Sequence, residues 1–418
     1  MSKLNIKRAV ENIRANTTVY TPVVEMIVNA IQAIDESGRT DGRVSIRAQR
    51  SSQPELDGSL PEVSSFEVED NGIGFTDVHR NSFDTLYTDL RINEGGKGFG
   101  RFTGLKYFED LHVKSVYRDG SDFKARSFSM GKDNDIIVRE KVAVSEKQEP
   151  GTVVTLSVLK KRRSFDKKLP TIARSLVERL LPYFITQDYM CPAIVLSEQD
   201  GSGAIRLNDF VSNELSAVIR EIGVERKTFT LKASDTEEEF QVRVFKLYAP
   251  RNPKSRISLV AHKREVTRSA IQKYIPEFED EFYEKDSRGE IDHARNFIIK
   301  AYVFGSYLDR NVSLERGGFE FHMESDLILG IAQAEIERDA ASIAKKAMGA
   351  DITLRQEKKK ERVQSYVDEE APWHKAILDK IDLNGMPYNP TNEEIEIKRD
   401  VVKLLAESNF ENVRKSVL

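Results

Sequence analysis

Three polar residues, Glu25, Asn29 and Gln32, interrupt an otherwise apolar stretch between residues 23 and 34. Their spacing places them in one narrow stripe if the stretch is helical. A carboxylate one helical turn from a carboxamide can hold a water molecule and a magnesium ion side by side. Glu25 would then act as a general base, and Asn29 would supply an oxygen ligand to the metal. The alternative is a thin solvated face on a mostly buried helix.

The sequence DNGIGF, residues 70–75, follows a segment in which apolar and polar residues alternate, a pattern that predicts a strand ending at Asp70. Gly72 and Gly74 permit positive φ angles and a close approach of the backbone to another group. A buried aspartate at the end of a strand needs a hydrogen-bond donor, and the amino group of a ligand such as adenine would supply one. An ordinary Asp-Asn-Gly hairpin turn is the alternative.

A loop rich in glycine lies at residues 94–104 and leads into the predicted helix GRFTGLKYF. Backbone amides in such a loop, next to a helix N-terminus, form a nest for anions such as phosphate, and Lys97 could add a positive charge. The spacing differs from that of the P-loop, and a solvent-exposed turn is the alternative. Further along, Gly151 and Thr152 open a predicted strand after Pro150.

The composition is that of a soluble globular protein. The 418 residues include 64 basic and 68 acidic side chains, for a net charge of −4. This balance excludes a strongly basic nucleic-acid-binding protein as a description of the whole chain, although it permits a local basic patch. The single cysteine excludes an internal disulfide and a multi-cysteine zinc site. No apolar run approaches the roughly 20 residues that span a bilayer, and no apolar signal segment opens the chain, so we expect a cytoplasmic protein without a membrane partner.

Two long helices are predicted in the first half of the chain, in addition to the short one at GRFTGLKYF. Thr21 as N-cap and Pro22 at the first helical position predict the start of the helix that carries the polar stripe, and Gly38 predicts its end. The second helix is predicted for LPTIARSLVERLLPYFI, which follows the basic run at residues 160–163.

The second half changes character along its length. Residues 196–325 alternate short strands with polar turns, which predicts a second α+β region. From residue 324 onward we expect a long, charge-rich helix, then an interruption at PYNPTNEE and a final helix capped by Thr391 or Asn392. The predicted fold class is therefore α+β.

Taken together in their order and spacing, four segments resemble the motifs of the GHKL, or Bergerat-fold, ATPase superfamily: EMIVN (25–29), DNGIGF (70–75), GGKGFGRFTGLKYF (95–108) and GT (151–152). That superfamily includes gyrase-type topoisomerases, the ninety-kilodalton heat-shock chaperone, histidine kinases and the mismatch-repair protein MutL. The third segment looks most like uncharacterised prokaryotic heat-shock-type ATPases, some of them associated with DNA or phage defence.

The resemblance implies a domain organisation. A Bergerat-type α/β sandwich that binds ATP, with an N-terminal strap, is expected at residues 1–160. A transducer-like α+β domain is expected at 161–325, and a C-terminal helical region at 326–418.

The resemblance also implies roles for residues of the first two motifs. Glu25 matches the general base that activates the attacking water, and Asn29 matches the magnesium ligand. Asp70 matches the carboxylate that recognises adenine, while Gly72 and Gly74 match residues that shape the pocket around the base.

The remaining matched residues would surround the triphosphate and support the base. Thr152 matches the residue that supports the water network between adenine and the aspartate. The lid that closes over the triphosphate is matched by Gly96, Lys97, Gly98, Phe99 and Gly100. One departure concerns Gln32, because the family often has an aspartate there and glutamine carries no charge.

The family also places a basic residue of the transducer domain against the γ-phosphate. The loop YLDRNVSLERGGFEF offers Arg316 for this role, with Arg310 and Lys263 as alternatives. Such an arginine would contact the charge that develops during phosphoryl transfer. A surface arginine in a turn is the alternative to this interpretation.

The function implied by the resemblance is magnesium-dependent ATP binding and hydrolysis. Closure of the lid would drive dimerisation of two copies through the N-terminal strap, residues 1–19, to form a molecular clamp, in DNA-related or phage-defence processes. The alternative is a nucleotide-sensing scaffold without hydrolysis that switches assembly with a partner effector protein.

Two further alternatives make their own predictions. A histidine kinase needs a phosphoacceptor histidine on a helical hairpin before the ATPase domain, and no such segment precedes residue 20. A DNA clamp needs a basic surface, for which the runs at 160–163 and 358–360 are candidates. Such runs are also typical of solvated helix faces.

Overall fold

The chain forms two compact units, each of which mixes helices with a β-sheet. Met1–Val211 and His262–Arg264 belong to the first unit, whereas Ser212–Ala261, Glu265–Ser313 and Gly317–Leu418 belong to the second. The predicted α+β fold class is therefore confirmed. The computed structural model describes residues 6–11, 17–52, 59–85, 100–212, 214, 217–225, 227–233, 236–285, 288–313, 318–321, 330–372, 383–397 and 400.

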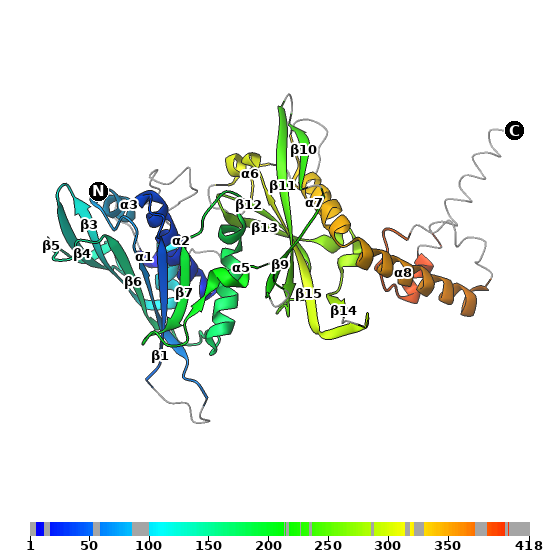
Figure 1. Cartoon of the computed structure of the whole chain (residues 1–418), viewed down its shortest axis with the longest axis horizontal. Coiled ribbons are helices and arrows are strands. Elements are labelled where there is room, and N and C mark those ends of the chain that lie inside the picture. Colours follow the sequence, from blue (N-terminus) through cyan, green and yellow to red (C-terminus); the bar gives the residue numbers. More distant parts are fainter. Residues whose placement is uncertain are drawn as a thin grey trace. The chain divides into compact units, whose positions relative to one another are not determined.

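The sheet of the first unit has the strand order β5-β4-β3-β6-β2-β1-β7-β8 (Figure 1). Its neighbours are antiparallel except for β1 and β7, which run parallel. Because β7 lies beyond residue 160, this unit extends past the end of the domain that the resemblance implies. The strands are β1 (Arg43–Arg50), β2 (Val63–Asp70), β3 (Phe108–Asp119), β4 (Asp122–Met130), β5 (Ile137–Val144), β6 (Gly151–Leu159), β7 (Ala193–Glu198) and β8 (Ile205–Arg206).

Two long helices of the first unit, α2 and α5, supply much of its core. Helix α2 contacts β1, β2 and β6 and also packs against α5 (Figure 1). Most of its apolar residues are buried, whereas Asn29 is exposed and Glu25 and Gln32 of the polar stripe are half-buried, as Val24 and Ala33 are. The helices are α1 (Ile6–Glu11), α2 (Tyr20–Ser37), α3 (Asp77–Asp84), α4 (Gly100–Tyr107), α5 (Leu169–Ile185) and the 3-10 helix η2 (Leu207–Phe210).

The start of α2 differs from the prediction, whereas its end agrees. The helix begins at Tyr20 and its N-cap is Val19, which makes no capping hydrogen bond through its side chain. Thr21 lies inside the first turn, and its hydroxyl accepts a hydrogen bond from the Thr18 N–H at 2.9 Å. The prediction of Thr21 as N-cap is wrong because this hydroxyl satisfies an amide before the helix and not one within it. Gly38 ends the helix in the left-handed region, at φ +68°.

The second unit is built on a sheet with the strand order β10-β11-β15-β12-β13, in which β9 also pairs with β11 and β14 with β15. Its apolar face joins α7 in one core, in which Phe240, Leu259 and Ile336 are fully buried. The strands are β9 (Ile219–Ile222), β10 (Thr228–Ala233), β11 (Thr236–Tyr248), β12 (Arg256–Ala261), β13 (Arg264–Ala270), β14 (Phe282–Lys285) and β15 (Ile291–Phe304). The helices are η3 (Ile271–Lys273), η4 (Pro276–Phe278), α6 (Ser306–Asn311), α7 (Gln333–Ala347) and α8 (Gly349–Glu369).

The long helix predicted from residue 324 onward is two helices. Helices α7 and α8 are separated by Met348, whose φ of −106° and ψ of 23° are not helical. Gly349 follows at once, and glycine is a poor helix former, so the chain turns where the propensity is lowest. Thr391 caps the next helical segment as predicted, because its hydroxyl accepts from the Glu394 N–H and the Glu394 carboxylate accepts from the Thr391 N–H.

Candidate functional site

The centre of the site is Asp70, the last residue of β2. It pairs with Thr152 across β6 and with Val44 across β1, so a strand on each side fixes its backbone. The side chain is buried, and its Oδ1 accepts a hydrogen bond from the Gly72 N–H at 2.9 Å. Burial raises the pKa of this carboxyl group to about 7, although hydrogen bonds from the backbone of Gly72 and Thr152 act to lower it. A buried carboxyl group at a strand end is what the sequence predicts.

Gly72 and Gly74 seat the turn after Asp70 between α2 and β3. A Cβ atom at Gly72 would collide with the backbone of Ala33 on α2, and one at Gly74 would collide with the carbonyl oxygen of Val116 on β3. Gly74 also has φ +82°, in the left-handed region. The Ile73 N–H donates to the Ala33 carbonyl oxygen at 3.0 Å. Both glycines are therefore required by close approach of the backbone to its neighbours.

Helix α2 brings the polar stripe to the same turn. Ala33, which bonds the turn, lies one helical turn beyond Asn29 and two turns beyond Glu25. The side chain of Asn29 is exposed, whereas that of Glu25 is half-buried. The structure thus joins the first two motifs through one helix, with about 12 Å along the helix axis between residues 25 and 33.

A hydroxyl pair lies behind Asp70. The Ser115 and Thr152 hydroxyl oxygens are 3.0 Å apart, and Ser115 donates to the Gly151 carbonyl oxygen at 2.9 Å. The Phe75 N–H donates to the Ser115 hydroxyl at 2.7 Å, which ties the end of the DNGIGF turn to β3. Sequence reasoning missed Ser115, because it is one of several serines in alternating strand segments and its register opposite Thr152 appears only in the folded sheet.

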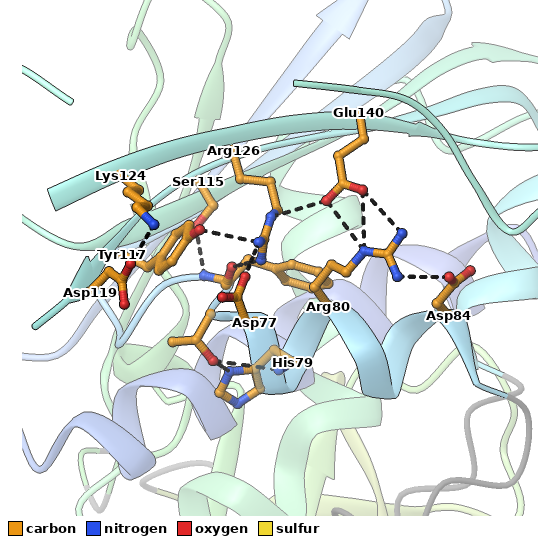
Figure 2. A network of polar contacts seen from close by, with 12 residues as sticks. Asp77, His79, Arg80, Asp84, Ser115, Tyr117, Asp119, Lys124, Arg126 and Glu140 are labelled. Atoms are coloured by element: carbon orange, nitrogen blue, oxygen red, sulfur yellow. Dashed lines mark hydrogen bonds and ion pairs between the residues drawn. The ribbon is translucent and has the colours of Figure 1, made fainter. Parts of the chain in front are cut away.

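A charged network links the same turn to strands β3, β4 and β5 (Figure 2). The Arg126 guanidinium donates to the Phe75 carbonyl oxygen at 2.7 Å and to the Tyr117 hydroxyl at 3.1 Å. It also forms ion pairs with Asp77, the first residue of α3, and with Glu140 of β5. Hydrogen bonding to Arg126 holds the pKa of Asp77 below its usual value. This network fixes the exit from the turn.

Arg101 fixes the start of α4. Its guanidinium donates to the carbonyl oxygens of Ser82, Phe83 and Thr85 at the C-terminal end of α3. Burial lowers the pKa of this arginine to about 10, with Asp84 acting in the opposite direction. These bonds link Arg101, next to Gly100, with the end of α3 and Thr85, on the other side of the segment 86–99.

Several predicted residues lie outside the part of the chain that the structure describes. Three of the related candidates are described. Gly100 is the first residue of α4, and the alternative transducer residue Arg310 forms an ion pair with Glu238 at 2.7 Å. Lys263, the other alternative, lies 3.8 Å from Asp35. The undescribed ones are Gly96, Lys97, Gly98, Phe99 and Arg316.

Sequence reasoning also missed Arg264, the residue next to Lys263. Its Nη1 donates to Oε1 of Glu25 at 2.7 Å, so the candidate base is paired with an arginine. The two residues are 239 positions apart in the sequence, and nothing in either local pattern predicts their contact.

The two basic runs have different surroundings. Lys161, Arg162 and Arg163 are exposed, as a solvated loop would be. In the second run Lys359 is buried, and its ammonium group donates to Glu277 at 2.6 Å. The run at 358–360 is therefore not a continuous basic surface.

The polar groups of the site are of the kind that a nucleotide with a magnesium ion would need. Asp70 provides a buried acceptor for an amino group, and Asn29 an exposed carboxamide oxygen. Magnesium is usually held by one or two protein oxygens together with substrate phosphates and water, so a single carboxamide is a sufficient protein contribution. Within the described ranges, no group of three or more histidine, cysteine or acidic residues could hold a metal ion by itself.

Comparison with known proteins adds little to this geometry. No protein-family model matches the chain, and no curated protein matches it. One similar solved structure is described as "Crystal Structure of N terminal domain of a DNA repair protein"; the alignment covers 71% of this chain and 86% of that one, at 13% identity and a TM-score of 0.39. That likeness is too slight to carry an argument about function. Among the described helices, none is both long and apolar enough to cross a membrane.

Proposed function

We propose that this protein is an ATPase of the GHKL type, which binds Mg-ATP and hydrolyses it. The observation that carries the proposal is the seating of the DNGIGF turn on α2, which places a buried acceptor, Asp70, against the helix that bears Glu25 and Asn29. A surface hairpin turn would need neither the buried carboxyl group nor the backbone contacts at Gly72.

Each residue has a defined role in binding. Asp70 accepts a hydrogen bond from the adenine amino group, and Thr152 with Ser115 supports it from behind. Asn29 supplies an oxygen ligand to magnesium, which when bound neutralises charge on the phosphates. Lys97 and the lid glycines, Gly96, Gly98 and Gly100 with Phe99, enclose the triphosphate, and Arg316 contacts the γ-phosphate.

Glu25 carries out the proton transfer of the hydrolysis step. Its carboxylate takes a proton from a water molecule as the water oxygen bonds to the γ-phosphorus. The bond from that phosphorus to the β–γ bridging oxygen breaks, so ADP leaves with the electron pair and inorganic phosphate forms. The proton on Glu25 then passes to solvent.

The physiological role proposed for this activity follows the family resemblance. ATP-driven lid closure couples to pairing of two copies through residues 1–19, and the resulting clamp acts on DNA or on a partner effector protein, in the cytoplasm and in DNA-related or phage-defence processes.

Calorimetry and phosphate release test this proposal. We expect the wild type to bind Mg-ATP with measurable heat and to release phosphate. Glu25→Ala should bind without turnover, and Asp70→Ala should not bind. Arg268→Ala is the matched control, because Arg268 is exposed and its ion pair within the described part of the chain is with Glu265, three residues before it. No heat of binding with the wild type would refute the proposal.

One observation favours a second candidate, a nucleotide sensor without hydrolysis. The ion pair with Arg264 occupies one of the two carboxylate oxygens of Glu25, which leaves fewer positions at which Glu25 can accept a proton from water. The two candidates differ in phosphate release, since a sensor would bind Mg-ATP and release no phosphate above an Asn29→Ala background.

A further inference from the structure

The turn between β12 and β13 has an unusual backbone. It consists of His262 and Lys263, both in the left-handed region at φ +48° and +58°. Two-residue hairpin loops of this kind normally use Asn-Gly or other glycine-containing pairs, because residues with a Cβ atom are strained there. Strain of this kind persists only where surrounding contacts hold it, and it clusters at functional sites.

Contacts with α2 and with Tyr189 hold this turn. The ammonium group of Lys263 lies over the Tyr189 ring, 3.5 Å from its centroid, and 3.8 Å from the Asp35 carboxylate. The Tyr189 hydroxyl in turn contacts both carboxylate oxygens of Asp35 at 3.0 Å. Lysine at this position is therefore specified by an aromatic face and a carboxylate together.

The residue after the turn, Arg264, meets Glu25. Arg264 Nη1 donates to Glu25 Oε1 at 2.7 Å, and the two side chains are 19% and 23% exposed. Burial acts to lower the pKa of Arg264, but Glu25 and the Tyr183 hydroxyl outweigh it and raise that pKa above its usual value. The pair uses one carboxylate oxygen only. The other, Oε2, accepts no hydrogen bond from any residue that the structure describes.

We propose that Arg264 is a positioning residue for the hydrolytic base Glu25, an inference that rests on the proposed ATPase function. A general base works best when a third group fixes its orientation, as the carboxylate does for histidine in catalytic triads. Arg264 anchors Oε1 and leaves Oε2 to accept the proton of the attacking water. The strained turn, which the contacts of Lys263 hold in place, fixes the position of Arg264.

With Arg264 in this role, hydrolysis depends on a residue outside the segment 1–211. Arg264 belongs to the same compact unit as Glu25. The residue that orients Glu25 therefore lies in a hairpin about 240 positions further along the chain.

The test compares the full-length variants Arg264→Ala, Arg264→Gln and Arg264→Lys with the wild type in a steady-state phosphate-release assay. Arg264→Ala and Arg264→Gln should lower kcat about tenfold or more, because a misplacement of about 1 Å at a reacting group can reduce rates a hundredfold. The dissociation constant for Mg-ATP, measured by calorimetry, should stay within twofold of the wild type. Arg264→Lys, which keeps the charge, should recover part of kcat, and so should added methylguanidinium with Arg264→Ala.

The controls separate this inference from the proposed function. Arg268→Ala removes an exposed arginine of the same strand and should keep the wild-type kcat. If the wild type hydrolyses ATP and Glu25→Ala does not, but Arg264→Gln keeps kcat within twofold or raises it, the positioning role is wrong and the ATPase stands. If the wild type does not hydrolyse ATP, both proposals fall. If Arg264→Ala does not fold, Arg264→Lys decides: wild-type kcat at saturating Mg-ATP overturns the role of the forked guanidinium, and a reduced kcat at unchanged affinity supports it.

Discussion

The buried carboxyl group of Asp70 makes a prediction that joins stability to function. Replacing it by asparagine keeps an oxygen that can accept from the Gly72 N–H but removes the titrating group. Burial raises the pKa of Asp70 from 3.8 to about 7 in the folded chain. The folded state therefore keeps a proton over a pH range in which the unfolded chain has lost it, so the contribution of Asp70 to stability falls as the pH rises from about 4 to 7.

The size of the effect follows from the shift in pKa. Each unit is about 1.4 kcal/mol, so an ionised Asp70 disfavours folding by about 4 kcal/mol at pH 8. Between pH 5 and pH 8, about 2–3 kcal/mol of this difference appears, because part of it is already present at pH 5. The wild type should lose this much stability relative to Asp70→Asn over that range.

Urea unfolding followed by far-ultraviolet circular dichroism, at pH 5 and pH 8, measures the difference. Comparing the two proteins at each pH cancels the titration of every other group. Asp70→Asn should also lose Mg-ATP binding at both pH 5 and pH 8. Equal changes in stability with pH for the two proteins would refute the argument, because Asp70 would then have the same pKa in the folded and unfolded chains.

Three further predictions concern contacts that hold the site and the second unit. Gly72→Ala should weaken Mg-ATP binding, measured by calorimetry, because the added methyl group collides with the Ala33 backbone; unchanged affinity would show that the turn can move without loss. Arg126→Met should weaken binding while leaving the second unit folded, because the turn loses its bond at the Phe75 carbonyl oxygen; hydrogen exchange at residues 70–75 should rise, and unchanged protection would contradict the role of the network. Lys359→Met should reduce the free energy of unfolding by about 3–5 kcal/mol, because Glu277 would be left buried and unpaired, and adding Glu277→Gln should recover part of the loss; an additive or larger loss in the double variant would contradict the pairing.

The elements that hold the site could largely be predicted from the sequence. The helix at LPTIARSLVERLLPYFI spans Leu169–Ile185, and the strand ahead of DNGIGF ends at Asp70. These segments are long and strongly periodic, so their local pattern decides their structure. Glycine was informative for the same reason, since Gly38, Gly72 and Gly74 each stand where a Cβ atom is strained or excluded.

Contacts between distant segments could not be predicted in this way. Arg264 reaches Glu25 across 239 positions, and Lys359 reaches Glu277 across 82. A charged residue in an amphipathic helix or a hairpin turn has the same local pattern whether it is solvated or paired in the interior. The basic run at 358–360 illustrates this, because its middle lysine is 1% exposed while the sequence suggests a solvated face.

The destabilisation that an ionised Asp70 causes is itself evidence about the role of the site. An aspartate that disfavours folding by about 4 kcal/mol when ionised would be replaced by a neutral residue at little harm to the fold if it served only the fold. Yet the surrounding chain is arranged to hold it: two glycines permit the turn, Arg126 fastens its exit, and Ser115 bonds its end. Natural proteins tolerate such local conflict where activity requires it. A ligand that donates a hydrogen bond to Asp70 would relieve the conflict, so the wild type should gain more thermal stability from Mg-ATP at pH 8 than from Mg-triphosphate, which lacks the base. Equal stabilisation by the two ligands would separate Asp70 from nucleotide recognition and leave its burial without a functional reason.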